Sequence, residues 1–163
     1  MTPPETITTL LFLVRDGQIL LARKKRGHGV GKWNGTGGKL EPGETPEQAA
    51  VRECHEEIGV TPIQIENRGI LHFTQEPRLD IYSNLDSHLY ICTKWKGEPT
   101  ETEEMQPQWF ATNDVPYDTM WPDDTHWLPA VIAGQSVEGW FHFDGDYTLQ
   151  TIKVEVFDGS STA

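Results

Sequence analysis

One stretch, from Gly38 to Val60 (GKLEPGETPEQAAVRECHEEIGV), constrains the fold of this chain more than any other. It carries the signals of a short helix with a defined start. Thr45 is a good N-cap residue, Pro46 suits the first helical position, and Gln48 completes a Thr-x-x-Gln capping box. Gly59 is typical of a helix C-terminus. We therefore predict a helix that begins after Thr45 and ends before Gly59.

Successive residues of a helix are separated by about 100°, so the predicted helix has two distinct faces. One face is apolar and should pack on the core; it comprises Ala50, Val51, Cys54 and Ile58. A second face carries the carboxylates of Glu53, Glu56 and Glu57, and Glu44 lies just before the helix. Carboxylates held this close repel one another, and a nearby cation would relieve the repulsion. Because Mg²⁺ prefers oxygen ligands and binds substrate phosphates beside carboxylates, this face is a candidate magnesium site. The alternative is that the glutamates are simply solvated.

A basic, glycine-rich segment precedes this helix and runs from Arg23 to Gly38 (RKKRGHGVGKWNGTGG). Next to a metal site, the cations that open it become candidates for holding phosphates; they are Arg23, Lys24, Lys25 and Arg26. On charge alone, a solvated surface loop explains them equally well. The glycines at 35, 37 and 38 permit a close approach of the backbone to a ligand, although glycines alone are weak evidence.

Composition limits the class of protein and of partner. The chain has 163 residues, enough for one domain with a sizeable core, and we expect a single domain over residues 1–163. Lys+Arg is 13 against Asp+Glu 25, a formal charge of -12, which argues against non-specific binding to nucleic acids or anionic membranes. There is no apolar run of about 18 residues and no basic signal-peptide start. The two cysteines lie in apolar surroundings, so a reducing, cytoplasmic location fits better than a disulfide framework.

The remaining pattern predicts strands and one further helix. Strands are expected at 7–14 and 18–22 around a turn at 15–17, then at 63–74, 89–95 and 108–111. A closing hairpin is expected from strands at 139–143 and 148–157, joined by a turn at Asp144–Gly145. We interpret 76–87 as a loop or irregular hairpin and 115–124 as a loop, followed by a helix at 125–133.

Trp121-Pro-Asp-Asp124 is the second informative stretch. Asp123 or Asp124 could simply cap the helix that follows. Alternatively, an aromatic wall beside two acids could recognise a purine, because carboxylates accept hydrogen bonds from ring N–H and amino groups, and a protonated carboxyl can also donate. Two adjacent acids in a dry pocket should share a proton and titrate as a pair.

The spacing of residues 38–60 resembles the Nudix box, G-x5-E-x7-R-E-U-x-E-E-x-G-U, in which U is a bulky aliphatic residue. Gly38, Glu44 and the run Arg52-Glu-Cys-His-Glu-Glu-Ile-Gly-Val60 match it, and the one departure is Cys54 at the first U, which still packs as a small hydrophobe. Further stretches resemble the MutT-homologue branch, the oxidized purine nucleoside triphosphatases. These are 24–27, 31–39, 104–107 with Trp109-Phe110, and 120–124.

The resemblance implies a fold and an activity. The fold would be α/β, with a mixed β-sheet sandwiched between α-helices. The enzyme would convert an oxidized purine nucleoside triphosphate, such as 8-oxo-dGTP and also 2-hydroxy-dATP, to the monophosphate and pyrophosphate, using Mg²⁺ or Mn²⁺. This activity cleans the nucleotide pool and prevents DNA damage. We expect a cytoplasmic monomer whose partner is a small-molecule nucleotide, with no nucleic-acid or membrane partner.

The resemblance also implies roles for individual residues. The metal would be held by the Gly37 carbonyl and by four carboxylates, those of Glu53, Glu56, Glu57 and Glu104. Arg52 would pair with Glu44 and orient the helix, and either Glu53 or Glu57 would act as general base. Asn34, Asp123 and Asp124 would read the base, with Trp121 stacking on it. The other positions expected at the substrate are Thr9, Lys24, Thr36, Gly37, Gly38, Lys39 and Phe73.

Three departures from the family pattern bear on the choice of base. His28 stands where the family often has an aromatic residue, Thr8 replaces a bulkier ring, and the region 80–87 is longer than the family's loop. A second hypothesis is therefore a Nudix hydrolase of another diphosphate, such as a dinucleoside polyphosphate or an unmodified nucleoside triphosphate. A binding module without catalysis would typically lack box glutamates, and all four are present here.

Overall fold

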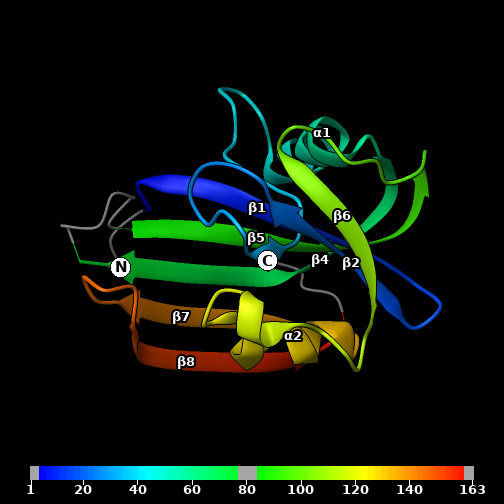
Figure 1. Ribbon diagram of the computed structural model, residues 1–163. Helices are drawn as coiled ribbons and strands as arrows, with labels where there is room; N and C mark the ends of the chain where they lie inside the picture. Colours follow the sequence, from blue (N-terminus) through cyan, green and yellow to red (C-terminus); the bar gives the residue numbers. More distant parts are fainter. Residues whose placement is uncertain (1–3, 77–83, 160–163) are drawn as a thin grey trace.

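The computed structural model describes residues 4–76 and 84–159, which form a mixed sheet with helices on both faces (Figure 1). The strands are β1 (Thr6–Arg15), β2 (Gln18–Lys24), β3 (Trp33–Asn34), β4 (Thr61–Gln75), β5 (Asn84–Lys96), β6 (Met105–Ala111), β7 (Gln135–Phe143) and β8 (Leu149–Asp158). The helices are α1 (Pro46–Ile58), the short 3₁₀ helix η1 (Tyr117–Thr119) and α2 (Asp124–Ile132). The predicted α/β class with a mixed sheet is confirmed.

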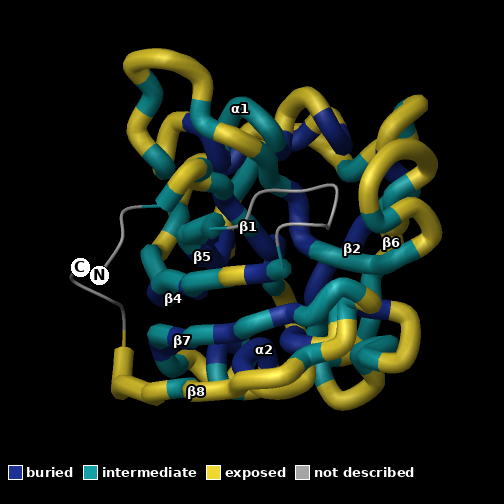
Figure 2. The backbone as a smooth tube through the Cα atoms, turned by 90° about the vertical axis from the view of Figure 1, so that its left-hand side faces the viewer, coloured by how far each residue is buried: buried dark blue, intermediate teal, exposed yellow. Residues whose placement is uncertain are grey.

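The sheet runs in the order β3-β2-β1-β5-β4-β7-β8, and β6 pairs with β2 outside this path. β1 pairs with β5 in parallel, as β4 does with β7, whereas β1–β2, β4–β5 and β7–β8 are antiparallel. α1 packs on one face of the sheet, against β1, and α2 lies across β7 and β8 on the opposite face (Figure 1). Figure 2 shows β8 as a largely exposed edge strand.

The start and end of α1 follow the sequence prediction. The Thr45 hydroxyl accepts from the Gln48 N–H at 3.1 Å, and the Gln48 side chain accepts from the Thr45 N–H at 3.0 Å, which completes the capping box. Gly59 ends the helix with φ 75°, a conformation that glycine adopts without steric cost, and its N–H donates to the His55 carbonyl at 2.9 Å. The orientation of the metal-site face is therefore fixed at both ends of the helix.

Two apolar clusters attach the helices to the sheet. Ala50, Cys54 and Ile58 of α1 pack with Leu11 and Leu13 of β1 in one of them. The other joins α2 to the opposite face through Trp127, Leu128, Val131, Phe12, Leu71, Leu89 and Phe141. The predicted apolar face of α1 needs one correction. Val51 is only half-buried, whereas Ala49 and Glu57 are buried, because the buried arc is rotated toward the Gly37 backbone that Glu57 contacts.

Several strands are longer than the sequence predicted. β2 extends through Arg23 and Lys24, so these two cations belong to a strand and not to a loop. Asn84 to Ser87 also belong to a strand, β5, although a loop was expected there; the rest of that expected loop, 77–83, lies outside the described residues. β5 is central in the sheet, so its backbone groups find partners in both β1 and β4, and the ladder continues through polar residues.

A histidine on β4 contacts acidic side chains on both neighbouring strands. The ring nitrogens of His72 on β4 lie 2.8 Å from the carboxylates of Asp86 on β5 and Glu138 on β7, and the ring stacks on Trp140. Burial lowers the pKa of His72, but the hydrogen bonds to Glu138 and Asp86 outweigh it, so the pKa lies above its ordinary value of 6.5. The ring of His72 therefore links three strands, and its protonated form is favoured by both carboxylates.

We expect this site to make stability depend on pH. A raised pKa means that the folded state retains a proton which the unfolded state has lost, so the stabilisation is complete below pH 6.5 and disappears as pH rises through the folded-state pKa. The difference in free energy of unfolding between wild type and His72→Gln, measured by urea titration, should shrink steadily over this range. If this difference stayed constant between about pH 6 and pH 9, the raised pKa of His72 would be contradicted.

Candidate active site

Arg52 organises the carboxylates around α1. Its Nε and Nη2 atoms donate to the two oxygens of Glu44 at 2.7 and 3.0 Å, and Nη1 donates to Glu53 at 2.8 Å and to Glu56 at 3.2 Å. Nη2 also donates to the Lys39 carbonyl at 3.1 Å, which ties the preceding loop to the helix. The hydrogen bond from Arg52 lowers the pKa of Glu44 and keeps it ionised. Bidentate pairing with Glu44 therefore sets the position of Arg52 relative to the box.

Glu57 is the most buried carboxylate of the box, with 3% of its surface exposed. Its Oε1 accepts a hydrogen bond from the Gly37 N–H at 2.8 Å. Burial, helped by the nearby charges of Glu53 and Glu104, raises the pKa of Glu57 to about 8 against the effect of that hydrogen bond. A β-carbon at Gly37 would lie 1.7 Å from the Thr9 carbonyl oxygen, so only glycine can bring its backbone this close to β1 and still reach Glu57.

Glu53 and Glu104 complete a group of acids that face one another. Burial raises the pKa of Glu53 although Arg52 opposes it, and the charges of Glu56 and Glu104 add to the rise. A β-carbon at Gly38 would lie 2.7 Å from the Glu53 carboxyl carbon, which shows how closely the loop covers this side chain. Glu53 and Glu57 of α1 therefore lie within electrostatic reach of Glu104, which directly precedes β6.

These residues fit a divalent cation. The donors are all carboxylate oxygens, and a cation would favour the charged forms that burial and mutual repulsion disfavour. Within residues 4–76 and 84–159, no three metal-ligating side chains are already gathered around one point. Arg52 explains this arrangement, because it draws Glu53 and Glu56 toward itself. Metal binding would require these two side chains to turn from Arg52.

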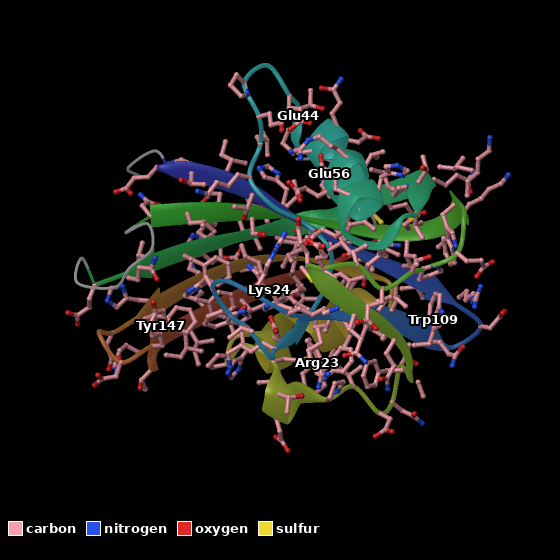
Figure 3. The ribbon with its side chains drawn as sticks, turned by 45° about the horizontal axis from the view of Figure 1, so that its top comes forward. Arg23, Lys24, Glu44, Glu56, Trp109 and Tyr147 are labelled. Carbon is pink, nitrogen blue, oxygen red and sulfur yellow. The ribbon has the colours of Figure 1, made fainter. Side chains whose placement is uncertain are left out.

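Most cations of the basic segment already have protein partners. Arg23 donates to Gln106 at 2.5 Å, Lys25 binds Glu101 at 2.6 Å, and Arg26 lies 3.6 Å from Glu104. Lys24 is placed differently. In Figure 3 it is seen between Glu56 on α1 and Tyr147, and its positive charge acts both on Glu57 and on the ring of His28. Lys24 thus lies between the carboxylate site and an aromatic pocket.

That pocket is an open hollow of about 340 Å³ whose walls come from three separate loops. The rings of His28 and Trp121 stack with centroids 5.0 Å apart, and Tyr147 lies 5.8 Å from His28 and 6.2 Å from Trp121. Lys32 Nζ lies 5.1 Å from the centroid of the Trp121 ring. Burial, followed by the charge of Lys24, lowers the pKa of His28, so this ring is neutral at pH 7. A flat aromatic group of a ligand can stack here.

Asp123 and Asp124 lie buried beside this pocket, with 4% and 2% of their surfaces exposed. Asp123 accepts from the Trp127 indole N–H at 2.8 Å, and Asp124 accepts from the Trp121 backbone N–H at 3.2 Å. Neither side chain caps α2, so the capping alternative is wrong. Burial raises the pKa of both carboxyls, and the charge of Asp123 raises that of Asp124 further. The two carboxyls therefore titrate as a coupled pair that retains a proton more readily than a free carboxyl does.

Comparison with known proteins agrees with this geometry. The NUDIX domain pattern matches residues 4–131. The chain belongs to the Nudix family. It is a hydrolase of phosphoric anhydrides, and members of this family typically use a divalent metal ion. A relative from Danio rerio, an "Oxidized purine nucleoside triphosphate hydrolase", is 41% identical over 149 residues, which cover 91% of this chain and 94% of the relative.

Two further relatives support the same placement. A protein of the same name from Mus musculus is 36% identical over 152 residues, covering 92% of this chain and 94% of the relative. Among solved structures, a MutT protein from Bacillus halodurans matches with a TM-score of 0.81 at 26% identity, covering 92% of this chain and 97% of that one. The Nudix fold therefore extends over almost the whole chain.

The other residues expected at the Nudix substrate fall into two groups. Thr9 and Thr36 are buried, and their hydroxyls lie 3.5 and 3.4 Å from the carbonyls of Gly38 and Leu11, so they tie the glycine-rich loop to β1. Asn34 is the last residue of β3, and Phe73 lies near the end of β4. The Asn34 oxygen accepts from the Gly35 N–H at 2.8 Å, and the Phe73 ring stacks on Phe141 and Phe143.

The structure also brings in residues that the sequence did not single out. Tyr147 comes from the turn between β7 and β8, and no local signal links that turn to Trp121. Lys32 was visible only as one cation among several. Thr102 donates to the Glu57 carbonyl at 2.8 Å and so fastens the segment before β6 to α1.

Proposed function

We propose that the protein is a Mg²⁺-dependent pyrophosphohydrolase that converts oxidized purine nucleoside triphosphates, such as 8-oxo-dGTP, to the monophosphate and pyrophosphate. The observation that carries this proposal is the buried, proton-sharing pair Asp123–Asp124 beside Trp121. Such a pair offers an acceptor and a donor at once, which suits a purine whose oxidation has changed its pattern of donors and acceptors. The names of the relatives from Danio rerio and Mus musculus support the same substrate class.

The layout of charges supports the way in which the substrate would lie. The carboxylates of α1 would hold Mg²⁺ (or Mn²⁺) with Glu104 and the Gly37 carbonyl, and the phosphates would bind there. Lys24 lies between this site and the rings of His28 and Trp121. Its positive charge would neutralise negative charge on the phosphate chain. The base would then reach the pocket at Trp121, with Asn34 at its edge.

A bound divalent cation would neutralise charge on the phosphate oxygens and lower the pKa of a water molecule. The chain itself would supply the base that takes the proton from that water. Glu53 is better placed for this role than Glu57, because it is only half-buried, whereas Glu57 is buried and bonded to Gly37. Arg52 would hold Glu44 throughout and would release Glu53 and Glu56 to the metal.

One observation favours a second candidate, a dinucleoside polyphosphate as substrate. The open hollow at His28, Trp121 and Tyr147 combines three rings with the positive charge of Lys32. A second base, or a terminal nucleoside, could stack there. We prefer an oxidized purine because a buried pair of acids can both accept and donate hydrogen bonds at the edge of a base, and because the relatives from Danio rerio and Mus musculus are named for that substrate class.

Initial rates on a panel of substrates distinguish these candidates. The panel contains 8-oxo-dGTP, 2-hydroxy-dATP, dGTP, dATP and a diadenosine polyphosphate, each with Mg²⁺. We expect an oxidized purine to be preferred over its parent nucleotide by ~100-fold or more, equivalent to roughly 2.7 kcal/mol of transition-state discrimination. Equal rates on dGTP and 8-oxo-dGTP, or the fastest rate on the dinucleotide, would refute the oxidized-purine assignment and leave the metal site standing.

We also propose that residues 1–163 act as one domain and as a cytoplasmic monomer. The net charge of -12 disfavours attachment to nucleic acids or anionic membranes. None of the helices in the described part of the chain has the length and apolar character needed to cross a membrane.

A further inference from the structure

Lys25 makes three bonds to a single short segment, Glu101–Glu104, which we call the acidic segment. Its Nζ donates to the Glu101 carboxylate at 2.6 Å and to the Thr102 carbonyl at 2.9 Å. Its backbone N–H donates to the Glu104 carbonyl at 2.9 Å. The sequence had suggested Lys25 as a holder of phosphates, but here its charge is engaged by the protein.

The acidic segment is also fastened to the C-terminal half of α1. The Thr102 hydroxyl donates to the Glu57 carbonyl at 2.8 Å, and the Thr100 N–H donates to the Ile58 carbonyl at 2.9 Å. The Thr102 hydroxyl in turn accepts from the Glu104 N–H at 3.3 Å. Lys25 on one side and α1 on the other thus hold the segment that carries Glu104.

Glu104 gains from such support because little else fixes it. Its side chain is 48% exposed, and its ion pair with Arg26 is long, at 3.6 Å. Glu53 and Glu57, in contrast, are fixed by a helix that is capped at both ends. An acid on an irregular segment can join two acids on a helix only if the segment itself is held, since an unrestrained loop costs ordering entropy when the metal binds.

We propose that Lys25 is a positioning residue that holds Glu104 against Glu53 and Glu57 for metal binding, and is not a phosphate ligand. This inference rests on the metal site of the proposed function, but it is independent of which nucleotide is the substrate. It assigns the Lys25–Glu101 ion pair a role in metal affinity. A phosphate ligand would act on the affinity for the nucleotide instead.

The test measures Mn²⁺ binding to the metal-free protein, without nucleotide, by calorimetry. Lys25→Met and Glu101→Gln should each weaken Mn²⁺ binding by about threefold to tenfold, since both remove the exposed, charge-assisted contact between the two side chains. Lys25→Met also removes the bond to the Thr102 carbonyl, so the double variant should bind no more weakly than Lys25→Met alone. Lys25→Arg, which can still bind Glu101, should restore wild-type affinity.

A matched ion pair on the far edge of the sheet provides the control. Lys153 Nζ lies 3.5 Å from Glu155 on β8, and both side chains are exposed. Lys153→Met and Glu155→Gln make the same chemical changes away from the site, and Mn²⁺ binding should stay at the wild-type level in both. Kinetics on the preferred nucleotide give a second readout. Lys25→Met should need more Mg²⁺ for half-maximal activity than wild type or Lys25→Arg, with KM for the nucleotide unchanged at saturating Mg²⁺.

Three results would overturn the inference. Unchanged Mn²⁺ affinity in Lys25→Met with a raised KM would show that Lys25 holds phosphates. Unchanged Mn²⁺ affinity in Glu101→Gln would show that the ion pair has no role. Unchanged Mn²⁺ affinity in Glu104→Gln would remove Glu104 from the metal site and the inference with it. Failure of the substrate proposal would appear differently, as slow hydrolysis of oxidized purines with these binding results intact.

Discussion

Glu57→Gln is expected to lower kcat by about 10³-fold, equivalent to roughly 4 kcal/mol of transition-state stabilisation. The substitution removes a negative charge that the divalent cation needs, at the most buried of the box carboxylates. The fold should survive, because the amide oxygen can still accept the hydrogen bond from Gly37, and a neutral group is easier to bury than a charged one. Steady-state rates at saturating Mg²⁺, together with thermal unfolding of the metal-free protein, measure both effects.

Glu47→Gln is the matched control for this experiment. Glu47 lies on the same helix, in its first turn, and is exposed. The same chemical change there should leave kcat within about twofold of wild type, because surface substitutions away from a site have small effects. A Glu57→Gln enzyme with wild-type turnover would refute the metal assignment, since the buried carboxylate would then have no part in the reaction.

Asp123→Asn and Asp124→Asn are expected to lower kcat/KM for 8-oxo-dGTP by about 100-fold each, or roughly 2.7 kcal/mol. Each amide still fills the buried space and can still accept from the Trp127 or Trp121 N–H. However, an amide can neither carry the charge nor share the proton of the pair, so one of the two contacts to the base is lost. Hydrolysis of dGTP should fall much less, and the preference for the oxidized base should therefore collapse.

The pH dependence of the preference gives a second check on the acid pair. Because the pKa of both carboxyls is raised, the shared proton is present at low pH and is lost as pH rises. The preference for 8-oxo-dGTP over dGTP should decline along with it in wild type. Asp118→Asn, at an exposed acid in the preceding turn, should show the wild-type profile. A preference that is flat with pH, or that survives in both buried variants, would contradict the role of the pair.

The sequence predicted the parts of this protein that depend on local physics. The caps and limits of α1 follow from Thr45, Pro46, Gln48 and Gly59, whose effects act within one turn of the helix. Strand positions followed from apolar runs, although β5 extends into polar residues because it is central and paired on both sides.

The sequence predicted which residue types form the candidate site, but not which contacts those residues make with one another. That Glu57 is buried against Gly37 depends on how the loop packs on β1, which helical periodicity does not reveal. The engagement of Lys25 by the acidic segment and the approach of Tyr147 to Trp121 are long-range contacts, for which the sequence carries no local signal. Lys25 was a candidate for holding phosphates only through its closeness to the predicted metal helix, and its partner Glu101 lies 76 residues further along the chain.

Selective hydrolysis of an oxidized purine triphosphate can be measured by competition in a single reaction. 8-oxo-dGTP and dGTP are mixed in equal amounts with the enzyme and Mg²⁺, and the nucleotide products are separated by chromatography. We expect 8-oxo-dGMP and pyrophosphate as the first products, with dGMP appearing about 100-fold more slowly. Equal formation of the two monophosphates, or release of inorganic phosphate with a nucleoside diphosphate, would contradict it.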